Sequence, residues 1–256
     1  MKIAFWSGEE KIGMTSSMAA AACVCSNVWD LKTVLLQSRN QKGDLYQKFD
    51  GSQCSCLGRR TRERLVTVRK GRMYYLMQPG YAKQEQYPEF FKKSMRRLIL
   101  RAEKFADITF IDCGSGEDEL AADILSSADV SVINISQGRQ CLNLFFQKRH
   151  AFHGSVIYLV NQYQQNSICD KQYLNRLYRI PKEALAVIPD NQFFRYAGDN
   201  GKMERFILRY ARCTNTDRQF YFMQELAHTV NMILYAGGFI KDMDKRHEGR
   251  ISGCSL

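Results

Sequence analysis

The stretch SGEEKIGMTSS, residues 7–17, decides the fold expected of this chain. It lies between a short apolar run and an alanine-rich segment with helical periodicity. Its spacing is that of a phosphate-binding loop, G-x-x-x-x-G-K-[ST], and Gly8, Gly13 and Thr15 occupy the expected positions. The lysine position holds Met14, so the loop lacks its main positive charge.

Short apolar runs alternate with helix-length segments along the rest of the chain. We expect strands at 2–7, 33–38, 107–114, 129–136, 155–162 and 185–190. Two further runs, RLVTVRK and RMYYLMQ, are joined by Lys70-Gly71 and predict a hairpin. Helices are expected at 85–104 and from about Asp118, Arg139 and Asp170, and a helical pattern dominates after the strand at 185–190, to about residue 236. Continuously apolar strands separated by helices predict an α/β fold, a doubly wound, mostly parallel sheet with helices on both faces.

Length and composition favour one globular domain. The 256 residues are 45% hydrophobic and 25% charged, and no Pro- or Ser-rich linker divides them. We therefore expect a single domain over 1–256, with 241–256 as a flexible tail. No run approaches the roughly 18 apolar residues typical of a membrane span, and no secretion signal precedes the first strand. The cytoplasm is the expected location, with peripheral attachment to membrane or nucleoid left open.

The cysteine and histidine patterns favour structural roles. Most of the nine cysteines lie in apolar strand or helix contexts, where free Cys behaves as a small hydrophobe. The pairs Cys23/Cys25 and Cys54/Cys56 have C-x-C spacing, and no second pair at zinc-site spacing joins them. The four histidines have no matched acid or cysteine nearby in sequence, so none is assigned to catalysis.

The loop can bind an anion without its lysine. The backbone amides at a helix N-terminus carry partial positive charge and bind phosphate whatever the side chains are. Thr15 can offer a hydroxyl to Mg²⁺, and Asp112, at the end of a later apolar strand, is the carboxylate expected behind it. The alternative is purely structural: Gly8 and Gly13 make a tight strand-to-helix turn, and the Ser and Thr hydroxyls cap the helix.

Several segments together resemble the MinD and ParA ATPases. SGEEKIGMTSSMAAAA lines up without a gap on their deviant Walker A loop, SGKGGVGKTTTAANLA. DITFIDCGSG resembles their magnesium-binding strand, ADVSVINIS their following strand, and VIYLVNQY a strand ending in an adenine-contacting Asn, here Asn161. IPDNQFF resembles the segment that closes over the base, which would put Pro189 near the adenine. The TadZ and CpaE branch, which positions pilus assembly machinery in bacteria, is the most similar.

The resemblance implies a P-loop NTPase fold of the MinD/ParA type that binds ATP or ADP with Mg²⁺. The implied nucleotide-binding residues are Gly8, Lys11, Gly13, Met14, Thr15, Ser16, Asn161 and Pro189. Thr15 and Asp112 are the implied magnesium ligands. A homodimer is implied as well, with pilus, secretion or partition machinery as the partner.

The departures from the family pattern bear on hydrolysis. The family's signature lysine, which reaches the partner's nucleotide in its sandwich dimers, falls on Glu9. The family usually has D-x-D-x-Q after its second strand, whereas this chain has QSRNQ, so Gln37 and Arg39 replace the carboxylates. Phosphoryl transfer depends on positioned positive charge and an oriented water. We therefore expect a positioning or scaffold protein with weak or no hydrolysis. An active ATPase that uses Lys11, and a scaffold that binds no nucleotide, stay open as alternatives.

Positive charge is concentrated in one segment. Residues 59–104 hold 14 Lys or Arg and 4 Asp or Glu, nearly the whole excess behind the net charge of +11. On the helix expected there, the cations lie broadly on one side: Lys92, Lys93, Arg96, Arg97, Arg101 and Lys104. A solvated helix face fits this pattern, and so does a surface for an anionic partner such as DNA, membrane or an acidic protein.

Overall fold

The computed structural model describes residues 1–38, 44–50, 64–69, 72–77, 88–148 and 152–241. These residues include an eight-stranded sheet in the order β3-β4-β2-β5-β1-β6-β7-β8. Its strands are β1 (Lys2–Ser7), β2 (Thr33–Gln37), β3 (Arg64–Arg69), β4 (Met73–Met77), β5 (Ile108–Ser115), β6 (Val130–Ile135), β7 (Ser155–Tyr163) and β8 (Leu185–Pro189). Every neighbouring pair is parallel except β3 with β4, which is antiparallel.

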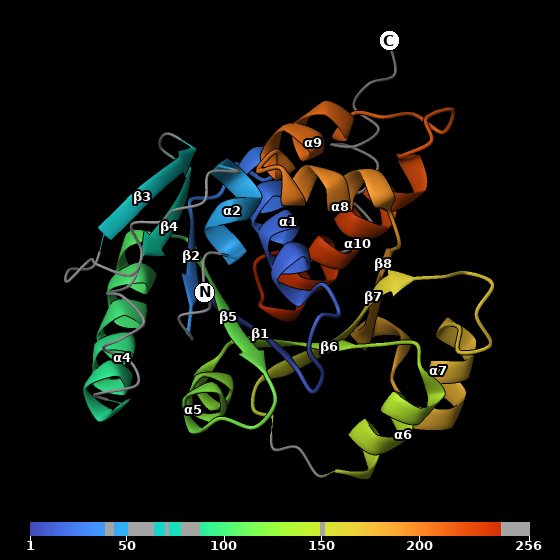
Figure 1. Cartoon of the computed structure of the whole chain (residues 1–256), viewed down its shortest axis with the longest axis horizontal. Coiled ribbons are helices and arrows are strands. Elements are labelled where there is room, and N and C mark those ends of the chain that lie inside the picture. The colour runs from blue at the N-terminus through green and yellow to red at the C-terminus, as the bar shows by residue number, and fades with distance from the viewer. Residues whose placement is uncertain (39–43, 51–63, 70–71, 78–87, 149–151, 242–256) are drawn as a thin grey trace.

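Helices cover both faces of the sheet (Figure 1). One face carries α1 (Met14–Asn27), α2 (Asp44–Asp50), α8 (Gln192–Asp199), α9 (Met203–Tyr210) and α10 (Phe220–Ala236). The other carries α4 (Pro88–Phe105), α5 (Glu119–Ser127), α6 (Arg139–Gln147) and α7 (Lys171–Tyr178), and a short 3₁₀ helix, η2 (Lys182–Ala184), precedes β8. The doubly wound, mostly parallel α/β fold predicted from the sequence is therefore confirmed.

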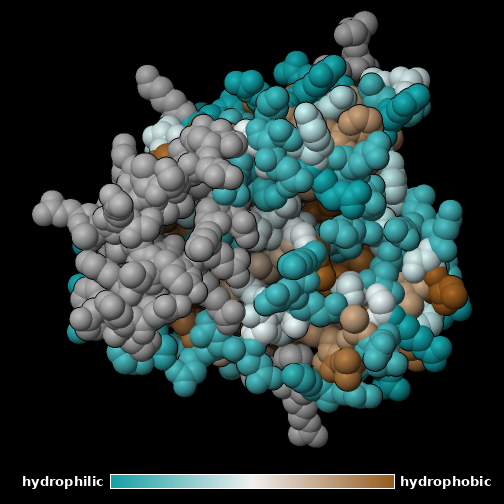
Figure 2. Space-filling view, in the orientation of Figure 1, coloured by the Kyte–Doolittle hydropathy of each residue, from teal (hydrophilic) through white to brown (hydrophobic). Residues whose placement is uncertain are grey.

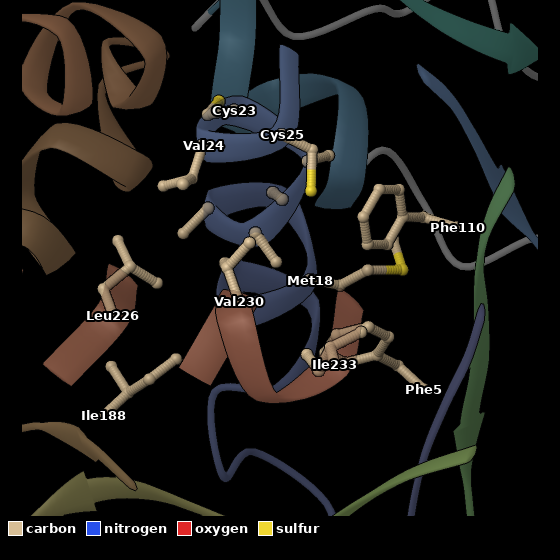
Figure 3. Packing of buried hydrophobic residues seen from close by; sticks show 14 of the residues in the cluster. Phe5, Met18, Cys23, Val24, Cys25, Phe110, Ile188, Leu226, Val230 and Ile233 are labelled. Atoms are coloured by element: carbon tan, nitrogen blue, oxygen red, sulfur yellow. The ribbon is translucent and has the colours of Figure 1, made fainter. Parts of the chain in front are cut away.

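Alternate residues of β1 face opposite hydrophobic clusters. Ile3 and Phe5 belong to the cluster under α1 and α10, whereas Ala4 and Trp6 belong to the cluster under α4 to α7. All four are almost completely buried, because helices cover both faces of the sheet at this strand. In Figure 3 the Met18 side chain of α1 extends toward the ring of Phe110, which lies next to Phe5. The carboxyl end of β1 is therefore fixed between two packed layers.

The segment after β2 contains a helix that the sequence pattern did not predict, α2, whose Leu45 is completely buried. A helix of seven residues spans two turns, too few for a clear apolar periodicity. The helix expected at 85–104 is described from Pro88 to Phe105, and proline is favoured in the first turn of a helix; residues 85–87 lie outside the described residues. Residues 242–256 and the Lys70-Gly71 turn lie outside the described residues, and the single-domain assignment stays a prediction.

Candidate functional site

The loop 8–13 leaves the carboxyl end of β1, the strand at which the order of the sheet reverses. β5 lies on one side of β1 and β6 on the other, so the loops that follow these strands diverge here. Ligands of open α/β sheets bind in the crevice that such a reversal creates. The loop leads directly into α1, which starts at Met14. The segment predicted from the sequence to bind phosphate therefore occupies the place where this fold binds ligands.

Two glycines shape the loop for different reasons. Gly13 precedes α1 with φ 84°, a left-handed conformation that favours glycine. Gly8 does not have a positive φ, but a Cβ at this position would lie 3.2 Å from Cδ2 of Phe145, tighter than most real contacts. Lys11 also has a positive φ, 60°, and its side chain is exposed.

No acidic side chain in the first turn of α1 can occupy the backbone amides at the start of this helix. The first turn of α1 has no acidic residue, and the first amides of a helix have no partner within it. Met14 is only 8% exposed and belongs to the cluster under α1, so the residue at the lysine position serves packing. Ser17 lies one turn further and both its amide and its hydroxyl donate to the carbonyl of Gly13.

Thr15 and Asp112, the two residues predicted to hold Mg²⁺, contact each other. The Thr15 hydroxyl donates to Oδ2 of Asp112 at 2.7 Å, and the amide of Gly114 donates to Oδ1 at 2.9 Å. Asp112 is 3% exposed and lies on β5, the neighbour of β1. The sheet therefore brings a hydroxyl and a carboxylate from distant parts of the sequence to one edge of the loop.

The Glu9 carboxylate is directed toward the β6–α6 connection. Both of its oxygens accept from the hydroxyl of Ser136, at 3.1 and 3.2 Å, and the Glu9 amide donates to Oγ of Ser7. The Cys141 thiol also bonds to Glu9, and this bond, with burial as a smaller cause, raises the pKa of Cys141 above its ordinary value. The residue at the family's signature lysine position thus has partners on the far side of the loop.

The position of Glu9 leads to a prediction about Cys141. Replacing Glu9 with Gln removes the carboxylate that disfavours the thiolate, so the pKa of Cys141 should fall toward its ordinary value. We expect alkylation of Cys141 by iodoacetamide at pH 8 to become at least about threefold faster, because the thiolate is the reactive form. Mass spectrometry of the Cys141 peptide over time measures the rate. Cys213, which is also partly exposed and has its pKa raised mainly by burial, is the internal control and should not change.

A cleft follows the loop and continues past it. Its larger part has a volume of about 940 Å³ and is lined by the loop, by Thr15 and by the end of β5. A smaller cavity of about 150 Å³ lies between the end of β7, the end of β8 and α8. The two share four lining residues, Gly13, Ser16, Lys48 and Asp199, and are therefore contiguous. Figure 2 shows a mostly hydrophilic face that is hollowed near its centre, below α8.

Asn161 and Pro189, predicted to contact a base, both line the smaller cavity. The amide group of Asn161 is nevertheless engaged inside the protein. Its Nδ2 donates to Oδ1 of Asn134 at 2.6 Å, its Oδ1 accepts a short hydrogen bond from Ser17, and the residue is 6% exposed. Asn161 therefore contributes a wall to the cavity, while its polar atoms connect α1 with β6 and β7.

Sequence reasoning missed several lining residues of the cleft, among them the charged pair Lys48 and Asp199. Lys48 lies on α2 and its ammonium is 3.2 Å from Oδ1 of Asp199, the last residue of α8. Neither belongs to a motif, so only the tertiary structure shows that they meet. Gln37, found in place of a family carboxylate, is buried and accepts from the Tyr75 hydroxyl at 3.1 Å, while Arg39 lies outside the described residues.

The basic side of α4 is partly neutralised by its neighbour α5. Lys92 forms ion pairs with Glu89 at 3.1 Å and with Glu119 at 2.5 Å. Arg96 pairs with Asp123 of α5. These two predicted surface cations therefore serve helix-to-helix contact. The exposed side chains of Lys93, Arg97, Arg101 and Lys104 complete the predicted basic surface.

No group of three or more His, Cys, Asp or Glu that could hold a metal ion occurs within the described residues. None of the helices in the described part of the chain combines the length and the apolar character needed to cross a bilayer.

The strand order and the strand-loop-helix segment match a known fold, that of solved ParA and MinD ATPases. A ParA family ATPase from Chlorobium tepidum has a TM-score of 0.67 at 14% identity, over 90% of this chain and 96% of that one. MinD from Pyrococcus horikoshii, complexed with Mg-ADP, has 0.64 at 17% identity, over 90% and 95%. A putative plasmid partition protein from Borrelia burgdorferi, bound to AMPPNP, has 0.56 at 14% identity, over 91% and 98%. The sequence matches no protein-family model and no curated protein. Likeness at these identities establishes the fold.

Proposed function

We propose that this chain is a MinD/ParA-like protein that binds ATP or ADP with Mg²⁺ and hydrolyses it weakly or not at all. In this proposal the nucleotide is a structural or switching ligand for a protein that positions or scaffolds a larger assembly in the cytoplasm. The single observation that carries it is the contact of Thr15 with Asp112 at the edge of an open cleft. A loop that served only as a turn would not need a cleft of this size beside it.

The residues present fit a magnesium-nucleotide. Thr15 and Asp112 supply the hydroxyl and carboxylate oxygens that Mg²⁺ prefers, and Thr15 sits next to the first amides of α1. Bound Mg²⁺ would supply positive charge against the phosphates. Gly13 and Ser16 line the cleft and would approach the phosphates by their backbone, whereas Gly8 does not line it; Asn161 and Pro189 would border the base.

Weak hydrolysis is proposed because other side chains occupy the positions of the family's charged residues. Met14 is apolar, Glu9 is negative and turned toward Ser136, and Gln37 is buried against Tyr75. Losing one transition-state donor typically costs a rate factor of about 10² to 10³. Lys11 is exposed beside the cleft, so an ATPase that uses it is the second candidate.

A pilus, secretion or partition apparatus is the kind of partner we propose, with a homodimer as the working unit. Support comes from the similar structures, which include a putative plasmid partition protein and a MinC:MinD cell division complex. Residues 59–104 would add contacts with DNA or an anionic membrane through the exposed cations of α4. The similarity to the TadZ and CpaE branch belongs to this proposal.

Titration calorimetry of nucleotide-stripped protein tests the proposal. We expect ATP and ADP to bind, more tightly with Mg²⁺ than without it, and an overnight assay to show little phosphate release. The Thr15→Ala variant should lose the gain in nucleotide affinity that Mg²⁺ gives, about tenfold or more, because a charge-assisted metal ligand is removed. Thr15→Ser keeps the hydroxyl and should retain the gain. Failure of the wild-type protein to bind either nucleotide would refute the proposal, and rapid phosphate release would favour the Lys11 ATPase.

A further inference from the structure

Lys48 reaches the cleft from a helix that is remote in sequence from the loop. It is one of the four residues that line both the larger and the smaller cavity. The larger cavity is lined by the phosphate-binding loop, and the smaller one by Asn161 and Pro189. A ligand that occupies both cavities must therefore pass Lys48. Its side chain is only 19% exposed, so its ammonium is held near this junction.

The place of the Lys48 side chain is built into α8. A Cβ on Gly198 would lie 3.3 Å from Cδ and 3.7 Å from Nζ of Lys48, so the absence of a side chain at this position leaves room for the lysine. The neighbouring residue, Asp199, holds the ammonium at 3.2 Å while its own side chain is 71% exposed. One partner of the pair is thus packed into place, and the other is mostly in water.

The charges around the larger cavity show why Lys48 matters. The ionisable residues that line it are Glu9, Glu10, Lys11, Lys48 and Asp199. Within the part of the chain that the structure describes, these are three acids and two bases, and the only base of the loop 8–13 is Lys11. A polyphosphate in this cavity requires a nearby cation, because repulsion from carboxylates is strong at close range. Lys48 is the lysine with a restrained side chain, since Lys11 is exposed.

We infer that Lys48 supplies the cation that the loop lacks. When a nucleoside di- or triphosphate binds, the Lys48 ammonium would leave Asp199 and pair with the phosphates. This inference rests on the proposed function, since it concerns the same cleft. An exposed carboxylate is a weak partner in water, whereas a polyphosphate offers more charge and several oxygens. Because the Lys48–Asp199 pair joins α2 to α8, nucleotide binding would exchange a contact between these helices for a contact with the ligand.

Calorimetry of full-length variants with ADP and ATP tests the inference. Lys48→Met should weaken binding of both nucleotides about tenfold or more and make it less sensitive to salt. Lys48→Arg keeps the charge and should restore most of the affinity. Asp199→Asn removes the competing carboxylate, so it should tighten binding. This opposite effect distinguishes a ligand contact from a purely structural ion pair, whose two partners would give the same result.

The effect of Lys48→Met needs a control in which a different ion-paired lysine is removed. Lys148→Met removes another lysine of an ion pair, Lys148–Glu117 at 3.1 Å, and should leave affinity unchanged. Lys11→Met should have a smaller effect than Lys48→Met. Wild-type binding with an unchanged Lys48→Met variant would overturn the role of Lys48 and leave the proposed function intact. An absence of wild-type binding would overturn both. If Lys48→Met is unstable in thermal melts, Asp199→Asn decides alone: tighter binding supports the inference, and unchanged or weaker binding overturns it.

Discussion

Replacing Gly13 with Val should lower the affinity for ATP and ADP by at least about tenfold. Gly13 has φ 84°, and a β-branched residue there costs about 1–2 kcal/mol of backbone strain. A Cβ would be in ordinary contact with Nε2 of Gln162 at 3.5 Å and Cβ of Asn161 at 3.9 Å, and because Gly13 lines both cavities, the two γ-methyl groups of Val would add bulk beside the cleft. Titration calorimetry with the magnesium-nucleotide measures the loss.

Gly238→Val is the matched control for Gly13→Val. Gly238 follows α10 with φ 73°, so it takes similar backbone strain, but a Cβ there meets no atom within 4 Å. We expect this variant to lose stability and to keep its nucleotide affinity. Equal affinity losses in both variants would attribute the effect to general destabilisation, and unchanged affinity in Gly13→Val would contradict the placement of phosphates at this loop.

Replacing Phe110 with Ala should lower the free energy of unfolding by about 3–5 kcal/mol. Phe110 lies on β5, is completely buried, and its ring centroid is 6.2 Å from that of Phe5. In Figure 3 its ring also faces Met18 of α1, so truncation leaves a cavity between the sheet and this helix. Whole domains are stable by about 5–15 kcal/mol, so the loss is a large part of the total. Chemical denaturation followed by circular dichroism gives the value.

Phe193→Ala shows what the same change does at the surface. Phe193 lies on α8 and is 51% exposed, so its removal opens no cavity, and we expect a change within about 0.5 kcal/mol. A loss of less than about 1 kcal/mol for Phe110→Ala would show that the layer under α1 can collapse around the missing ring.

The sheet could be predicted from the sequence because its strands are buried on both sides. Such strands are continuous apolar runs, and the observed β1 has the bounds expected from KIAFWS. The contact between Thr15 and Asp112 could also be predicted, because the carboxyl ends of parallel strands share one edge of the sheet.

The Lys48–Asp199 pair could not be predicted in the same way. Its two residues lie on α2 and α8, and their meeting depends on how these helices pack across α1. No local pattern encodes that packing. The orientation of the Glu9 side chain could not be predicted either, because its partner Ser136 is 127 residues away in sequence.

The polar network around Asn161 has a consequence for the energetics of recognition. Ser17 of α1, Asn161 of β7 and Asn134 of β6 bond in sequence, and Asn134 donates further to the carbonyl of Trp6 on β1. If α1 slipped along the sheet, these buried groups would lose their partners at about 1–3 kcal/mol each. The network therefore fixes the register of α1, and with it the first amides of the helix, before any ligand arrives. If the proposed nucleotide binds here, a preorganised site of this kind would spend little conformational entropy on binding, so modest attraction from a few groups would suffice to hold the ligand.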